Sequence, residues 1–174
     1  MVKLNFDMPE NFFEPEVRSG YQVPSESKKL WAVELDLLNE FKRVCKEYGI
    51  RYYAVGGTLI GAARHNGFIP WDDDIDVAMM WDDFKKFMEI APYEFKYPYF
   101  FQSYKTDDMT EVSHARIRNS MSTGFTQWEH DNIHTPPTGY HKGIFMDIFQ
   151  LFPVPQEASA RAIQKKRLIL PGGR

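Results

Sequence analysis

Two aspartates separated by one residue are the first feature of the sequence that could do chemistry. Asp74 and Asp76 open a segment, residues 74–79, in which polar and apolar residues first alternate, as in a strand with one wet and one dry face. Side chains two positions apart on a strand point to the same face, so the two carboxylates would repel each other unless a cation lay between them. Mg²⁺ suits such a pair, because it takes carboxylate oxygens, waters and substrate phosphates as ligands. Two solvated acids at a strand edge are the alternative.

Asp147 is the lone acid in a nearly pure apolar run, Gly143-Ile-Phe-Met-Asp-Ile-Phe149. A charge in such a strand is costly unless it is paired or bound to a metal. A buried salt bridge is one solution. With Asp74 and Asp76 in view, a third carboxylate from a neighbouring strand, which binds metal or acts as a base, is the favoured one. Three carboxylates from two strands can hold two metal ions.

Gly56-Gly57-Thr58 separates a short β-branched and aromatic stretch, residues 50–55, from a predicted helical turn, residues 58–64. Glycines let the backbone approach a ligand, and amides at a helix N-terminus attract phosphate. An ordinary tight turn explains these three residues equally well when they are taken alone. The phosphate-cradle interpretation gains weight because a metal-phosphate site needs such a turn close to its carboxylates.

Other motif interpretations fit poorly. The alternating acids of residues 72–76 resemble the start of a calcium loop, but Val77 replaces its turn glycine and Asp83 its terminal glutamate. His130 and His134 lack the His-Glu-x-x-His pattern of a zinc site.

The composition limits the function classes further. The chain has 174 residues, 21 Lys plus Arg against 24 Asp plus Glu, and a net charge of −3, which argues against broad nucleic-acid binding. Its length suits one domain. The single cysteine, Cys45, excludes an internal disulfide and a multi-thiolate metal site, and we expect it to be a core thiol. The absence of a signal peptide and of a long apolar run predicts a cytoplasmic protein without a membrane span.

The elements expected to position these residues follow from apolar spacing and from turn residues. We expect an irregular arm over residues 1–24 and a helix from Ser25 or Ser27, either of which could cap it, to Tyr48, with Gly49 as its stop. Further segments are predicted as strands (residues 50–55, 74–79, 114–118 and 143–149), helices (residues 81–91 and a basic one at 157–170), an extended aromatic stretch (residues 93–101) and a long loop (residues 119–142). This order predicts an α/β or α+β fold.

The run from Tyr53 to Met79, YAVGGTLIGAARHNGFIPWDDDIDVAM, closely resembles the signature of the LicD family. The similarity extends to Lys29-Leu-Trp31, to Arg116-Ile-Arg118 and to the strand that contains Asp147, and so covers roughly residues 20–155. This family comprises phosphorylcholine transferase-like proteins, related to the fukutins, within the nucleotidyltransferase-fold superfamily.

The resemblance implies a small mixed β-sheet flanked by helices, with a LicD-type domain over residues 25–174 that is either minimal or truncated at its C-terminus. It also implies metal-dependent transfer of a phospho-substituent, such as phosphocholine, from a CDP-linked donor such as CDP-choline to a sugar hydroxyl of a cell-surface glycan. Asp74, Asp76 and Asp147 would be the catalytic acids and would hold Mg²⁺ or Mn²⁺.

Substrate contacts are expected from a wider set. The turn would cradle phosphate, one of three arginines would neutralise the leaving nucleotide, Trp71 would stack on a ligand or simply pack, and the acids beside Asp74 would support the metal or face choline. These residues are Gly56, Gly57, Thr58, Arg64, Trp71, Asp72, Asp73, Arg116 and Arg118.

Two other functions stay open. A nucleotidyltransferase that uses CTP would need the same three acids, and a non-catalytic glycan- or nucleotide-binding relative would keep the fold without turnover. The basic residues 161–167 could contact the inner face of an anionic membrane, or form a solvated helix face.

Overall fold

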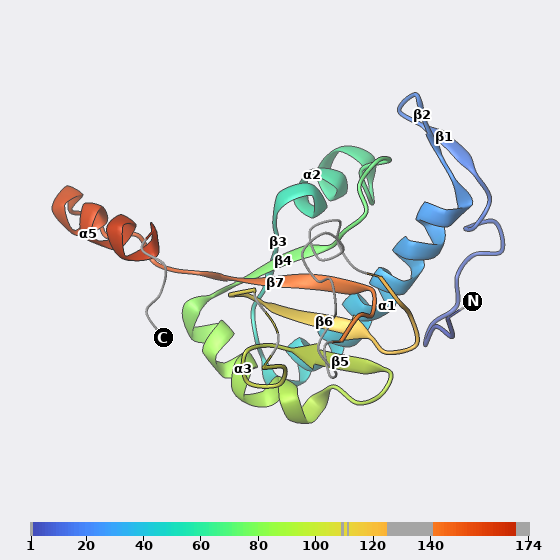
Figure 1. Cartoon of the computed structure of the whole chain (residues 1–174). Coiled ribbons are helices and arrows are strands. Elements are labelled where there is room, and N and C mark those ends of the chain that lie inside the picture. Colours follow the sequence, from blue (N-terminus) through green and yellow to red (C-terminus); the bar gives the residue numbers. More distant parts are fainter. Residues whose placement is uncertain (1, 109, 111, 125–140, 170–174) are drawn as a thin grey trace, which may run out of the picture.

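A five-stranded sheet forms the centre of the molecule (Figure 1). The computed structural model describes residues 2–108, 110, 112–124 and 141–169. The strands, in their order across the sheet, are β3 (Tyr53–Ala54), β4 (Asp76–Met80), β7 (Phe145–Leu151), β6 (Ala115–Asn119) and β5 (Tyr99–Gln102). The β4–β7 pair is parallel and the other pairs are antiparallel. The predicted mixed sheet flanked by helices is confirmed.

Helices α1 (Ser25–Tyr48) and α3 (Trp81–Glu94) pack together on one face of this sheet. The shorter α2 (Gly56–His65) lies beside the β3–β4 edge, and α5 (Ala158–Ile169) projects away from the sheet after β7 (Figure 1). In the described part of the chain, no helix combines the length and the apolar character needed to cross a membrane.

The alternation of side chains along the strands gives the sheet two different faces. One face carries Val77, Ile117 and Ile148, which pack with α1 and α3 into the hydrophobic core. The predicted core position of Cys45 is confirmed, since its side chain is buried in this core. The opposite face carries Asp76, Asp147 and Arg116.

Helix α1 follows the predicted apolar spacing and ends as expected. Gly49 adopts a left-handed conformation with φ of 62°, and its N–H donates to the last carbonyls of the helix. The predicted serine cap is wrong, because Pro24 occupies the cap position in extended conformation and Ser25 already lies inside the helix.

Several predicted boundaries also differ, and the strand predicted over residues 50–55 is reduced to β3. Strand β4 begins at Asp76, so Asp74 lies in the preceding loop rather than on the strand. Helix α3 continues through Pro92 to Glu94, because Phe95 closes its last turn by donating to Ala91 O at 3.2 Å and packs into the core. Of the extended aromatic stretch predicted over residues 93–101, only residues 99–101 lie in a strand, β5.

The N-terminal arm contains a β-hairpin where an irregular segment was predicted. Strands β1 (Glu16–Arg18) and β2 (Tyr21–Val23) are joined by Ser19 and Gly20, both with positive φ, as a tight hairpin turn requires. Most of the loop predicted over residues 119–142, together with His130 and His134, lies outside the described residues.

Phe87 is the clearest test of the core. Its ring is fully buried and lies 5.5 to 6.0 Å from the rings of Phe41, Phe95 and Phe101. We expect Phe87→Ala to lower the free energy of unfolding by about 3–5 kcal/mol, measured by urea denaturation. Tyr93→Ala on the same helix is the control, because that ring is 73% exposed and its loss should cost less than about 0.5 kcal/mol. Equal losses would contradict this core assignment.

Candidate functional site

Three charged residues form a row across the polar face of the sheet. Asp76 on β4 lies directly opposite Asp147 on β7, and Asp147 in turn lies opposite Arg116 on β6. Directly paired residues of adjacent strands share a face, so the sheet brings together the two acids that the sequence placed on neighbouring strands. The backbone N–H of Asp147 also donates to Ile75 O at 3.0 Å, which ties the start of β4 to β7.

Asp147 forms the partly buried ion pair that the sequence left open as an alternative. Its Oδ1 accepts hydrogen bonds from Arg116 Nε at 2.7 Å and from His114 Nε2 at 3.0 Å. Burial by itself raises the pKa of Asp147, but the hydrogen bond from His114 and the charge of Arg116 outweigh it, so the pKa is lowered. Asp147 is therefore held in its ionised form.

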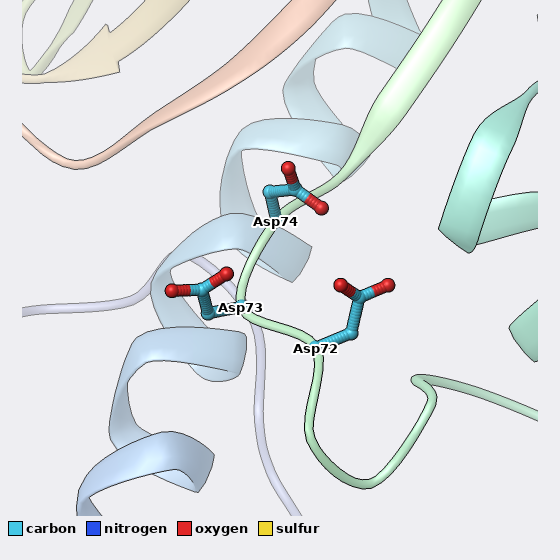
Figure 2. A group of neighbouring side chains, drawn as sticks. All are labelled: Asp72, Asp73 and Asp74. Carbon is cyan, nitrogen blue, oxygen red and sulfur yellow. The ribbon is translucent and has the colours of Figure 1, made fainter. Parts of the chain in front are cut away.

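Three consecutive acids project from the loop that leads into β4 (Figure 2). Asp72, Asp73 and Asp74 each offer a carboxylate oxygen, and these oxygens lie within 4.8 Å of one another. Among the described residues these three acids are the group whose oxygens lie this close together, and Asp74 is the member that also belongs to the predicted trio of Asp74, Asp76 and Asp147. Asp74 precedes the strand, and Oδ1 of Asp147 accepts a hydrogen bond from Arg116 of β6.

Burial and mutual repulsion shift the titration of these acids. The pKa of Asp74 is raised to about 6, first by burial and then by the charges of Asp76, Asp72 and other nearby acids. Burial followed by the charge of Asp147 raises the pKa of Asp76. A bound cation would relieve this repulsion.

The Gly-Gly turn lies against two of the carboxylates. A Cβ atom on Gly56, where φ is 55°, would lie 3.1 Å from Asp76 Oδ2, and one on Gly57 would lie only 2.1 Å from Asp72 Oδ2. The glycines thus allow the N-terminus of α2 to approach the acids. Thr58 adds a positioning contact that the sequence did not reveal, because its Oγ1 accepts a hydrogen bond from Asp76 N at 2.8 Å.

The other two predicted arginines, Arg64 and Arg118, lie in different surroundings. Arg64 is exposed in the last turn of α2, about 12 Å of helix from Gly56. Arg118 is fully buried and donates to Gln102 Oε1 at 2.6 Å and to Gly143 O at 2.9 Å. Of the three predicted arginines, Arg116 is the one that the structure places against Asp147.

Trp71 is 59% exposed. Its ring makes edge contacts with Tyr21 of the N-terminal hairpin and with His65 of α2. The packing alternative for Trp71 thus has a structural basis, while its exposed surface leaves room for a ligand.

Glu34 on α1 belongs to the site and was missed. Its side chain is 2% exposed, and it lines a cavity together with Asp73, Asp74 and Asp147. Burial, followed by the charges of Asp74 and the neighbouring aspartates, raises its pKa well above the usual value. The signal in the sequence was an acid on the apolar stripe of the helix, four positions after Leu30.

The model of the LicD/FKTN/FKRP nucleotidyltransferase domain matches residues 49–160, which is more than half of the 174 residues. The chain belongs to this LicD/FKTN/FKRP family. The match includes the Gly-Gly turn, the acidic loop and all three predicted catalytic acids.

Curated relatives match shorter segments. The lipopolysaccharide cholinephosphotransferase LicD of Haemophilus influenzae is 54% identical over 56 residues, which are 32% of this chain and 21% of that protein. The ribitol 5-phosphate transferase FKRP of Homo sapiens is 48% identical over 40 residues, 23% of this chain and 8% of that protein. An uncharacterized protein of Rickettsia typhi is 39% identical over 68 residues, 39% of this chain and 21% of that protein. The matched segment thus spans about a fifth or less of each relative, and the two relatives named for an activity are transferases of a phosphate-bearing group.

The donor set of this LicD-family site fits a hard divalent cation. All the side chains gathered at the loop are carboxylates, the oxygen ligands that Mg²⁺ and Mn²⁺ prefer. The buried Oε2 of Glu34 has no hydrogen-bond partner, so one more oxygen at this cavity lacks the positive group that would balance it.

Gly57→Ala should alter the candidate site while leaving the stability of the fold nearly unchanged. The new Cβ displaces the Asp72 carboxylate, while alanine favours the helix, so we expect a free energy of unfolding within about 1 kcal/mol of wild type. The increase in melting temperature caused by Mn²⁺ should shrink. Gly67→Ala is the control, because the nearest atom to its Cβ, Arg18 Nη1, is 3.9 Å away. The same Mn²⁺ effect in both variants would contradict the close approach at Gly57.

The acidic loop also predicts a pH dependence in EDTA. Asp74 has a pKa of about 6 in the fold against its usual 3.8, so the folded protein binds more protons between these values and its stability falls as pH rises from 4 to 6. Asp147 has the opposite shift, but its contribution is lost only below pH 3.8. After allowance for solvent screening of the half-buried Asp74, the free energy of unfolding should fall by on the order of 1–2 kcal/mol between pH 4 and pH 6.

Urea denaturation at pH 4, 5 and 6 measures this decrease. Asp74→Asn should reduce this decrease but not abolish it, because the pKa values of Asp76 and Glu34 are raised as well. Asp82→Asn, which alters an exposed acid on α3, should leave it unchanged. A wild-type stability that rises with pH over this range would contradict the shift.

Proposed function

We propose that this LicD-family chain is a metal-dependent phosphotransferase. It moves a phospho-substituent such as phosphocholine from a CDP-linked donor such as CDP-choline to a sugar hydroxyl of a cell-surface glycan. In this proposal residues 25–174 form the transferase domain, and residues 1–24 form its N-terminal arm. The transfer forms a bond between the acceptor oxygen and the substituent phosphorus, breaks the pyrophosphate bond and releases CMP, while the acceptor proton passes to a base.

The observation that carries the proposal is the position of the Gly56-Gly57 turn against the acids. The N-terminus of α2 attracts anions, and here it lies beside the carboxylates of Asp72 and Asp76. A diphosphate with its cation matches both halves of this arrangement, because the cation neutralises the acids and the phosphates face the helix terminus. The activity named for the Haemophilus influenzae relative supports the choice of donor.

Asp74 and Asp76, with Asp147, would hold Mg²⁺ or Mn²⁺, which neutralises charge on the donor phosphates when it is bound. Asp147 suits a cation-binding role better than that of a base. Its hydrogen bonds from His114 and Arg116 lower its pKa, whereas a general base works best with a pKa near the operating pH.

Neighbouring residues of the chain orient these acids. Thr58 Oγ1 accepts from the N–H of Asp76 and fixes the start of β4. Arg116 is close enough to Asp147 to orient it and carries the positive charge that a leaving nucleotide requires. Arg118, which is buried beneath the same face, supports this region through Gln102.

In this proposal the protein would reach a glycan acceptor carried on a membrane lipid at the cytoplasmic face of the membrane. The exposed Arg161, Lys165 and Lys166 of α5 could supply a peripheral contact with anionic lipid there.

The test is CMP release from CDP-choline in the presence of Mg²⁺ and a glycan acceptor. Asp76→Asn and Asp147→Asn should each reduce the rate at least about 100-fold, because each removes a charge that faces the donor. Asp82→Asn, which alters an exposed acid on α3, should keep the wild-type rate. CDP-ribitol and CDP-glycerol in place of CDP-choline test which substituent is transferred.

Two outcomes would replace the proposal. Release of pyrophosphate from CTP without CMP release would assign nucleotidyl transfer. Binding of donor that is equal in wild type and Asp76→Asn, with no turnover in either protein, would assign a binding module.

A further inference from the structure

Glu34 is the most unusual buried side chain outside the predicted catalytic set. It lies in α1 with 2% of its side chain exposed, and its Oε2 has no hydrogen-bond partner. Burying an unpaired carboxyl group is unfavourable. The charges that act on Glu34 come from Asp72, Asp73, Asp74 and Asp76, all of the same sign. The core packing of α1 therefore gives no reason for an acid at this position.

The cavity beside Glu34 shows what the acid faces. Its volume is about 230 Å³, and its acidic lining comes from three segments: Glu34 from α1, Asp73 and Asp74 from the acidic loop, and Asp147 from β7. Leu30 of α1 also lines it. Leu30 and Glu34 are one helical turn apart and so face the same direction. Since a water molecule occupies about 30 Å³ in the liquid, the cavity has room for a cation with several of its waters.

The carboxyl groups of Glu34, Asp73, Asp74 and Asp147 thus line one cavity. Among the ion pairs of the described residues, Asp147 is the one of these four acids that pairs with a cation, Arg116. We propose that Glu34 is a fourth acidic residue of the cation site, whose carboxylate faces a divalent cation held by Asp74 and Asp147 and binds it directly or through its water. The proposal rests on the metal dependence of the proposed function. It adds a residue from α1 to a site otherwise built from the loop and the sheet.

The experiment is a Mn²⁺ titration of the full chain, with free Mn²⁺ measured by electron paramagnetic resonance. Glu34→Gln keeps the shape of the side chain and removes its charge, and we expect the Kd for Mn²⁺ to rise about 10- to 100-fold. Glu34→Asp keeps the charge but withdraws it by one methylene group, so its Kd should lie between those of wild type and Glu34→Gln. Glu47→Gln is the matched control, since Glu47 is exposed on the same helix and its Kd should equal the wild-type value.

A second measurement separates a role in cation binding from a purely structural one. In EDTA, Glu34→Gln should melt at or above the wild-type temperature, because the change removes an acid that is surrounded by other acids. A structural role predicts the reverse, a lower melting temperature in EDTA with an unchanged Kd for Mn²⁺. That result would overturn the proposal. If Glu34→Gln does not fold, Glu34→Asp decides, and an unchanged Kd in that variant would equally overturn it.

Failure of this proposal is distinguishable from failure of the proposed function. If wild type and Glu34→Gln bind Mn²⁺ equally while CMP is released, Glu34 has no part in the site and the transferase stands. If Glu34→Gln weakens Mn²⁺ binding but no CMP is released, the role of Glu34 stands and the transferase does not. Stabilisation of the wild type by choline but not by Mn²⁺, lost in Glu34→Gln, would assign an organic cation to the cavity and overturn the metal assignment.

Discussion

Repulsion between carboxylates is the constraint on which the rest of the site depends. Residues 72–76 hold four acids within five positions, and their charges add to burial in raising the pKa of Asp74. The fold holds these acids by their backbone rather than by their charge. Trp31 Nε1 donates to Asp72 O at 2.8 Å, and Thr58 Oγ1 accepts from the N–H of Asp76. The carboxylates consequently stay available to a cation while the loop that carries them is fixed.

The charge of the residues on this face of the sheet changes from negative to positive from one strand to the next. In the direction perpendicular to the strands, Asp76 is followed by Asp147, Arg116 and Gln102, each directly opposite the next. Adjacent strands are about 4.8 Å apart, so the carboxylate of Asp147 and the guanidinium of Arg116 come from positions one strand spacing apart. One half of the face suits a cation, and the half that contains Arg116 suits the negative charge of a phosphate. Asp147 belongs to both halves, because it lies opposite Asp76 on one side and forms an ion pair with Arg116 on the other.

Local patterns in the sequence predicted the parts of the fold that are determined locally. The spacing of apolar residues and Gly49 predicted α1 and its end, and the lone acid in an apolar run marked Asp147. The position of Asp74 before β4 was not predictable in this way, because the strand begins where β7 pairs with it. The ion pair of Asp147 was left open because it depends on the partner strand β6. The role of Glu34 depends on a contact between α1 and a loop about forty residues later, which no local pattern encodes.

Helix α1 joins the core and the site in one rigid element. Its second half packs Phe41 into the core, while Trp31 in its first half stacks on Phe68 with ring centroids 4.7 Å apart and bonds to the acidic loop. Glu34 lies between these two regions, at a position where a leucine would satisfy the helix and the core better. Natural sequences depart from such local preferences mainly at functional sites. An acid kept in the apolar stripe of the longest helix is therefore best explained by the cavity that it lines, and it makes α1 part of the site as well as part of the scaffold.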